Sequence, residues 1–178
     1  MSANNLDILS GCRKNNRQAQ KALYDSFAPM AMGVCMRYAH SRAEAEDWLQ
    51  DGFVRVFEKI GQVRSEAQLG AWIYSVMTHV CLKHCRKRRL PIKEVGDEVD
   101  VVEFPTDPFA NEEVVTALQQ IAPQQRAVFN LMAVEEYNYA EAAKELQCSE
   151  SNVRALYSRA KSRLRELLRN QESRIDAI

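Results

Sequence analysis

A helical segment near the middle of the chain carries residues that could bind nucleic acid. At 100° of rotation per residue, Trp72, His79, Lys83 and Arg86 fall on one stripe of the segment AWIYSVMTHVCLKHCRKRRL. An aromatic ring can stack on an unpaired base, a histidine can hydrogen-bond, and cations can hold phosphates. The alternative is a core tryptophan, a surface histidine and a basic helix end that complements the macrodipole. The segment alone favours neither interpretation.

A second nucleic-acid pattern lies near the C-terminus, where a helix, a short turn and a second helix follow one another. We expect helices over residues 139–146 and 151–168, with a turn at residues 147–149. In a helix-turn-helix, the start of the second helix meets base edges and its other cations meet phosphate. A solvated helix of a bundle is the weaker alternative, because the helix lengths, the turn and the basic bias agree. The donors suited to base edges are Asn152, Arg154 and Arg159.

Helices must position both surfaces, and the hydrophobic spacing predicts five more of them. Residues 43–60 place Leu49, Phe53, Val56, Phe57 and Ile60 on one face. Ser41 and Glu44 have the spacing of a capping box, and Gly61 is a natural stop. The other helices are expected at residues 16–27, 29–39, 112–121 and 123–134.

Charge is segregated along a chain whose formal net charge is zero. Every charge from Lys83 to Lys93 is positive, and every charge from Glu94 to Glu113 is negative. The acidic stretch contains two prolines and has no helical period, which is typical of a linker. We therefore predict an all-α fold of two small helical domains joined by an acidic linker. The predicted limits are 1–90 for the first domain, 91–112 for the flexible linker and 113–178 for the second domain.

Several function classes are disfavoured by the sequence. No apolar run reaches the length of a membrane span, and the N-terminus does not resemble a secretory signal, so a cytoplasmic protein is expected. The five scattered cysteines are expected to be reduced and mostly buried. No phosphate-binding loop, nucleophile elbow or HExxH pair is present, so we expect no enzyme and no cofactor. A metal or redox sensor on Cys81, His84 and Cys85 is an unfavoured alternative, because structural zinc usually needs four ligands.

Three stretches together resemble one known family. The AED..Q..F core at Ala45, Glu46, Asp47, Gln50 and Phe53, the stretch AWIYSVMTHVCLKHCRKRR, and the stretch LQQIAPQQRAVFNLMAVEEYNYAEAAKELQCSESNVRALYSRAKSRLREL are similar to regions 2 and 4 of the extracytoplasmic-function sigma factors. That resemblance covers nearly the whole chain. It implies a bacterial transcription initiation factor of the sigma-70 family, with a region 2-like bundle and a region 4-like helix-turn-helix.

The resemblance also implies three contact surfaces. The first would open the −10 element and hold a flipped base near the loop 61–68, through Arg64, Ser65, Trp72, Ser75, His79, Lys83, Arg86, Lys87, Arg88 and Arg89. The second would read the −35 element, through Ser151, Asn152, Arg154, Ser158, Arg159 and Arg163. The third would dock on the clamp of the largest polymerase subunit, through Asp47, Gln50, Asp51, Val54 and Glu58.

The implied partners are core RNA polymerase, promoter DNA and, as often in this family, an anti-sigma factor. No membrane insertion, small-molecule substrate or bound metal is implied. The chain departs from the family pattern at His79, where asparagine is common, and at Lys83, where an acidic residue is common. An autonomous helix-turn-helix regulator that works without polymerase is the alternative, but it would leave the patterns of the first domain unused.

Overall fold

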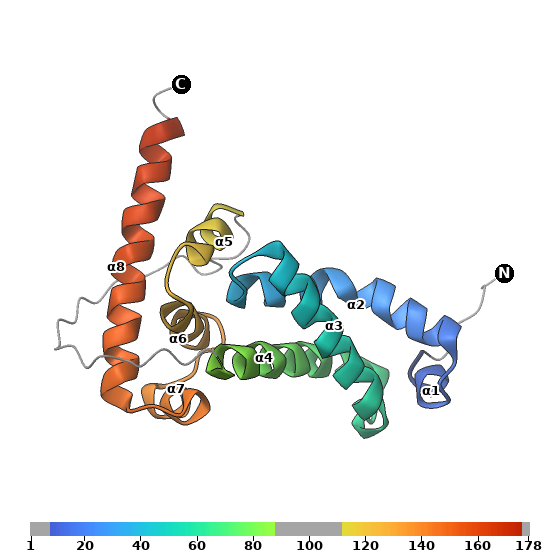
Figure 1. Ribbon diagram of the computed structural model, residues 1–178. Coiled ribbons are helices and arrows are strands. Elements are labelled where there is room, and N and C mark those ends of the chain that lie inside the picture. Colours follow the sequence, from blue (N-terminus) through green and yellow to red (C-terminus); the bar gives the residue numbers. More distant parts are fainter. Residues whose placement is uncertain (1–7, 88–111, 176–178) are drawn as a thin grey trace. The chain divides into compact units, whose positions relative to one another are not determined.

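The computed structural model describes residues 8–87 and 112–175, and none of these residues lies in a strand. The predicted all-α fold is confirmed in these ranges (Figure 1). Two 3₁₀ turns, η1 (Ile60–Gln62) and η2 (Glu66–Gln68), accompany the α-helices. The α-helices are α1 (Ile8–Arg13), α2 (Arg17–Tyr38), α3 (Arg42–Lys59), α4 (Leu69–Lys87), α5 (Glu112–Gln119), α6 (Pro123–Ala133), α7 (Tyr139–Leu146) and α8 (Glu150–Ile175).

The chain forms two compact units. Within the described residues, the first unit comprises residues 8–36 and 41–81, and the second comprises residues 37–40, 82–87 and 112–175. The proposed limits of 1–90 and 113–178 stay a prediction. Apart from Glu112, the acidic linker predicted at 91–112 lies outside the described residues, as do Arg88 and Arg89.

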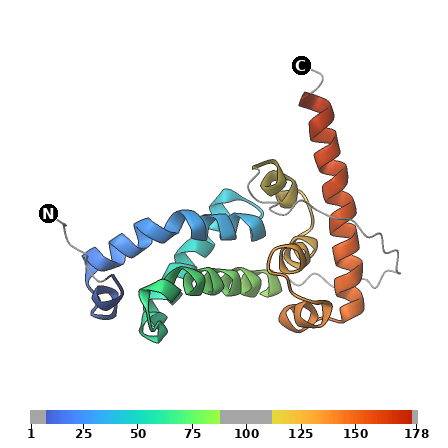
Figure 2. The same cartoon turned by 180° about the vertical axis from the view of Figure 1, so that it is seen from behind.

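The first unit is built on α2, α3 and α4, which Figures 1 and 2 show side by side. Its core includes the fully buried side chains of Leu23, Val34, Ile73 and Met77. The sequence predicted two helices, 16–27 and 29–39, but α2 is one continuous helix with Pro29 inside it. Proline removes one backbone hydrogen bond, and burial of Leu23 and Val34 on either side of it holds the helix together.

Helix α3 begins where its sequence predicts. Ser41 is extended and its Oγ accepts a hydrogen bond from the backbone N–H of Glu44 over 3.3 Å. The helix ends at Lys59 and continues directly into η1, which contains Gly61. This glycine does not have a positive φ, so the chain turns there through a tightened 3₁₀ turn rather than a left-handed cap.

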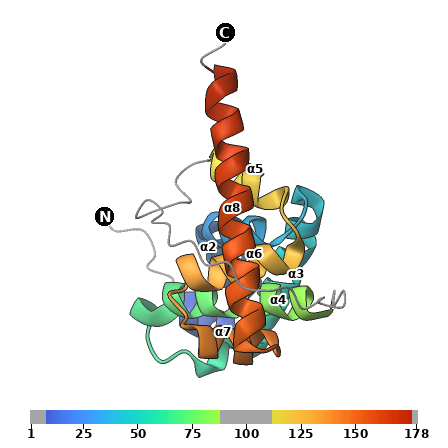
Figure 3. The same cartoon turned by 90° about the vertical axis from the view of Figure 1, so that its left-hand side faces the viewer.

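The second unit is organised around α8, which contacts α5, α6 and α7. Figure 3 shows the three shorter helices along α8, whose C-terminal end extends past α5. The core here includes Leu118, Phe129 and Leu164, all fully buried. Helix α8 continues to Ile175, beyond the predicted end at residue 168, because no glycine or proline interrupts the residues that follow.

The turn between α7 and α8 is tightly determined by local contacts. Asn138 and Glu141 form a reciprocal capping box at the start of α7, with both bonds at 2.9 Å. Gln147 ends the helix in the left-handed conformation, at φ 55° and ψ 47°. The Oγ atom of Ser149 accepts from the backbone N–H of Asn152 over 3.3 Å, which caps the start of α8.

Candidate nucleic-acid interface

The predicted row on α4 faces solvent. Ser75, His79 and Lys83 are exposed and Trp72 is half-buried, at spacings of three and four residues along the helix. The opposite side, including Ile73 and Met77, is buried. Trp72 is therefore only partly buried, and it lies in line with hydrogen-bonding and cationic side chains. Such a row can stack on a base and hold a phosphate.

His79 is oriented by its own helix. Its Nδ1 atom lies 2.8 Å from the backbone carbonyl oxygen of Ser75, one turn earlier. A carbonyl oxygen can only accept, so Nδ1 must carry the hydrogen and donate it. The hydrogen bond therefore fixes the direction of the ring, with Nδ1 as the donor.

At the end of α4 the cations have different environments. Within the second unit, Arg86 is partly buried and its Nη1 atom donates to the carbonyl oxygen of Glu145 over 2.9 Å and to Oε1 of the same residue over 3.1 Å. Lys87 is exposed. The sequence grouped Arg86 with the free cations, whereas the structure gives its charge a carboxylate partner on α7.

The loop between α3 and α4 exposes Arg64 and Ser65 shortly before the start of α4. Val63 is buried, and its carbonyl oxygen accepts a hydrogen bond from Nη2 of Arg13 on α1. Oε1 of Glu66 accepts from the backbone N–H of Leu9 over 3.5 Å. The loop is thus anchored on both sides of the two exposed residues.

The predicted residues of α8 fall on two neighbouring stripes. Ser151, Arg154 and Ser158 share one stripe, and Asn152, Arg159 and Arg163 share the next. Lys161, which the sequence counted among the basic residues of this helix, faces inward instead: it is 8% exposed and its Nζ lies 4.6 Å from the centre of the Tyr157 ring.

The exposed side chain of Arg154 on α8 contacts both an aromatic ring and a carboxylate. Its guanidinium carbon lies 4.1 Å from the ring centre of Tyr139, the first residue of α7. Its Nη2 atom lies 3.7 Å from Oε2 of Glu150, one turn earlier on α8. The ring and the carboxylate restrict the directions that the guanidinium can take. Tyr139 was not among the predicted site residues, because only the turn geometry brings it next to α8.

Two other predicted cations of this helix, Arg163 and Arg159, differ in their exposure. Arg163 pairs with Glu166 over 2.6 Å on the exposed surface, where an ion pair contributes little to stability. Arg159 is half-buried, and its Nη2 atom is shielded from solvent with no hydrogen-bond acceptor among the residues that the structure describes.

The predicted polymerase-facing residues on α3 form one continuous exposed row. All five are exposed, at spacings of three and four residues, and Val54 is 56% exposed. The residues of this row are Asp47, Gln50, Asp51, Val54 and Glu58. A large aliphatic side chain between carboxylates, on a helix whose other face is core, is a suitable surface for a protein contact.

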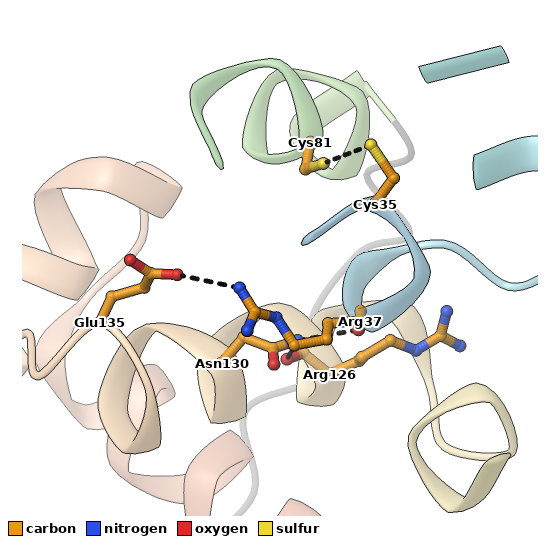
Figure 4. Close-up of polar contacts among 6 residues, drawn as sticks. All are labelled: Cys35, Arg37, Cys81, Arg126, Asn130 and Glu135. Atoms are coloured by element: carbon orange, nitrogen blue, oxygen red, sulfur yellow. Dashed lines mark hydrogen bonds and ion pairs between the residues drawn. The ribbon is translucent and has the colours of Figure 1, made fainter. Parts of the chain in front are cut away.

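The cysteines that raised the metal alternative lie in the core. Cys81 and Cys85 are buried, and Sγ of Cys81 lies 3.9 Å from Sγ of Cys35 on α2 (Figure 4). Within residues 8–87 and 112–175, no group of three or more histidine, cysteine or acidic side chains could hold a metal ion. The arrangement places both thiols in helix packing.

A buried arginine holds the second unit together and was not predicted. Arg126 is fully buried and donates to the carbonyl oxygens of Tyr38, Leu118, Gln119 and Ile121. One turn later on α6, Nδ2 of Asn130 donates to the carbonyl oxygen of Arg37 over 2.9 Å (Figure 4). The Nη2 atom of Arg37 in turn lies 3.8 Å from Oε1 of Glu135. The helices of this unit therefore rest on a polar as well as an apolar core.

Two family models match the chain. Sigma-70 region 2 matches residues 23–90, and Sigma-70 region 4 matches residues 111–164. A curated relative, the RNA polymerase sigma-H factor of Pseudomonas aeruginosa, is 22% identical over 177 residues and covers 90% of this chain and 92% of its own.

Other proteins that are named as sigma factors also match this chain. The ECF RNA polymerase sigma factor SigM of Mycobacterium tuberculosis is 23% identical, covering 92% of this chain and 84% of its own. SigX of Bacillus subtilis is 27% identical, covering 84% of both chains. Among solved structures, the sigma factor RpoE in complex with the anti-sigma factor NepR from Bartonella quintana is 21% identical, with a TM-score of 0.49, covering 84% of this chain and 96% of its own.

Among the described helices, none is long and apolar enough to cross a membrane.

Proposed function

We infer the function from one premise: this chain belongs to the sigma-70 family, in its extracytoplasmic-function group. On that premise it is a bacterial transcription initiation factor that binds core RNA polymerase and directs it to specific promoters. It works in the cytoplasm, and the polymerase performs the chemistry. An anti-sigma factor is a proposed further partner.

One observation carries this function: a region 2 match is followed along the chain by a region 4 match. In each matched region, the helix predicted to contact DNA, α4 or α8, has exposed side chains. The α4 row, together with Arg64 and Ser65, is proposed to melt and read the −10 element. Extruding a base costs a few kcal/mol, and stacking on an aromatic ring such as that of Trp72 would offset that cost. Arg88 and Arg89 belong to the same proposal but lie outside the described residues.

The second unit is proposed to read the −35 element. The N-terminal half of α8 presents Asn152, Arg154 and Arg159 as donors to base edges, while Arg163 is placed farther along for phosphate contact. The exposed row on α3 is proposed to dock on the polymerase clamp. An autonomous regulator would have no use for that row or for the α4 row, so it is not favoured.

The test is transcription from fragmented genomic DNA of the host with purified core RNA polymerase, with and without this protein, followed by mapping of RNA 5′ ends. New starts that share −10 and −35 elements are the expected result. DNA binding without any new start would instead identify an autonomous regulator.

Variants assign the surfaces in the same assay. Val54→Glu is expected to weaken core polymerase binding, because it adds a charge at the apolar centre of the α3 row. Lys21→Glu is the matched control, since Lys21 is an exposed residue of α2 outside all three proposed surfaces. An equal effect of both variants would count against the α3 assignment.

A further inference from the structure

The short helix α1 packs closely against the start of α2 (Figure 1). Leu9 and Cys12 are buried on its inner side, and a Cβ atom at Gly11 would lie 2.5 Å from Cβ of Ala19. Helix α1 lies before residues 23–90, the part of the chain that the region 2 model matches. None of its residues belongs to the three proposed contact surfaces, so its role in the proposed function is open.

Arg13, the last residue of α1, reaches the loop between α3 and α4. Its Nη2 atom donates a hydrogen bond to the carbonyl oxygen of Val63, whose side chain is buried. That oxygen belongs to the planar peptide unit that joins Val63 to Arg64. A donor on this oxygen therefore restricts the orientation of the peptide plane and, with it, the direction in which the Arg64 side chain leaves the backbone.

A second hydrogen bond joins α1 to the other side of the exposed loop residues. Oε1 of Glu66 accepts from the backbone N–H of Leu9 over 3.5 Å, which is a long bond. The backbone N–H of Leu69 donates to the carbonyl oxygen of Glu66, which ties this residue to the start of α4. Arg64 and Ser65 thus lie between two points of contact with α1, and both are exposed.

We propose that Arg13 is a positioning residue for the −10 element: its hydrogen bond to the Val63 carbonyl oxygen holds Arg64 and Ser65 where they meet the extruded base. The proposal rests on the function proposed above and adds α1 to the parts of the chain that determine −10 recognition. Groups that bind a ligand must be held within about 0.5 Å of their working positions by the residues behind them. Loss of the bond should therefore weaken the contacts of the loop, although no group that touches DNA is removed.

Three variants test the bond. Arg13→Met removes the donors and keeps an aliphatic side chain, whereas Arg13→Lys keeps one cationic donor and should recover part of the loss. Lys14→Met is the matched control, because Lys14 is the exposed neighbour of Arg13 and its replacement changes the net charge equally. Both positions are exposed, so none of the variants is expected to disturb folding, and thermal unfolding checks this.

The experiment uses a promoter mapped by the transcription assay, in which the −10 element is already unpaired by mismatches. Each base of its non-template strand is replaced in turn by an abasic site, and binding of the polymerase holoenzyme is measured. The unpaired template removes the cost of melting from the comparison. The double variant Arg64→Ala/Ser65→Ala identifies the position that the loop contacts, because there the abasic site should no longer weaken binding.

At that position the abasic site is expected to weaken binding of the wild-type holoenzyme by about 10-fold or more, the scale of one base contact. Arg13→Met should lower this factor by about 3-fold or more, the size of one hydrogen bond, and leave the factors at the other positions unchanged. In the Arg64→Ala/Ser65→Ala background, Arg13→Met should have no further effect. Lys14→Met should behave as the wild type at every position.

Three other outcomes overturn the proposal. If Arg13→Met leaves the factor at the loop position unchanged, the bond does not position the loop. If Arg13→Met and Lys14→Met weaken binding to all templates equally, Arg13 acts through its charge on phosphates. If Arg13→Met lowers the unfolding temperature and the factors at all positions together, Arg13 supports the fold and not the loop.

The proposed function has a separate criterion in the same experiment. Failure of the unmodified promoter to bind or start with the wild-type holoenzyme would refute the function itself, whatever the variants do. Normal binding and starts, with no effect of Arg13→Met at the loop position, would refute only the role of Arg13.

Discussion

The Nε atom of Arg126 donates a hydrogen bond to the carbonyl oxygen of Leu118 over 2.7 Å, and neither side chain is exposed. The two other nitrogens of the guanidinium donate to Tyr38, Gln119 and Ile121 over 3.0–3.2 Å. A single buried cation thus satisfies carbonyl groups at the C-terminal ends of α2 and α5, where helices lack N–H partners.

Replacing Arg126 by methionine is expected to destabilise the second unit by about 3 kcal/mol or more, because four carbonyl oxygens each lose a hydrogen bond, although that of Leu118 also accepts from the backbone N–H of Ile121. Arg126→Lys should recover only part of the loss, since one ammonium group cannot reach all four oxygens. Urea unfolding followed by circular dichroism measures the change. Arg163→Met, on the exposed side of α8, is the control and should be close to neutral.

Gln147 offers a site for stabilisation. It holds the left-handed conformation at the C-terminus of α7, where a side chain costs roughly 1 kcal/mol relative to glycine. Gln147→Gly is therefore expected to raise the free energy of unfolding, as measured by thermal or urea denaturation. Gln18→Gly, in the first turn of α2, should lower it, because glycine there only adds backbone entropy to the unfolded chain. A destabilised Gln147→Gly would mean that the side chain makes a contact worth more than the strain.

Tyr139 is expected to position Arg154 for the −35 element. Tyr139→Leu removes the cation–π contact and should reduce discrimination between the natural −35 sequence and a mutated one by about 2- to 5-fold. Tyr139→Phe keeps the ring and should behave as the wild type. Competition binding of the holoenzyme to the two promoters gives the ratio. In the Arg154→Ala background, Tyr139→Leu should not reduce this discrimination any further. A further reduction there would mean that Tyr139 acts through the fold and not through Arg154.

The cysteines are expected to differ in reactivity. Cys12, Cys35, Cys81 and Cys85 are buried, and Cys148 is half-buried. Burial also raises the pKa of the Cys12 thiol, which lowers the fraction of reactive thiolate at a given pH. At pH 8 a thiol-specific chromogenic reagent should modify Cys148 first, and the remaining thiols only on the timescale of unfolding. Rapid modification of all five thiols in the folded protein would contradict this packing.

Two helical glycines should respond to alanine in opposite directions. A Cβ atom at Gly11 would lie 2.5 Å from Cβ of Ala19, which is fully buried, so α1 and α2 would have to move apart. Gly11→Ala is expected to destabilise the first unit by about 1–3 kcal/mol. Gly33 lies in α2 with nothing within 4 Å of an added Cβ, and Gly33→Ala should stabilise by about 0.5–1 kcal/mol. Chemical denaturation of both variants against the wild type provides the comparison.

The sequence by itself determined the features that depend on neighbouring residues. The start of α3 at Ser41, the bounds of α7 and the exposed rows on α3 and α4 follow from capping residues and helical spacing, which act within a few residues. The family followed in the same way, because its motifs are local patterns. The −10, −35 and clamp assignments built on those rows stay predictions.

Only the tertiary structure decided the features that depend on residues far apart in the chain. Pro29 lies inside one helix because core packing outweighs a lost hydrogen bond, and Arg126 is buried because distant carbonyl groups converge on it. Arg86 is paired rather than free because Glu145 lies beside it. Local sequence cannot show such contacts, since their free energies come from groups that folding alone brings together.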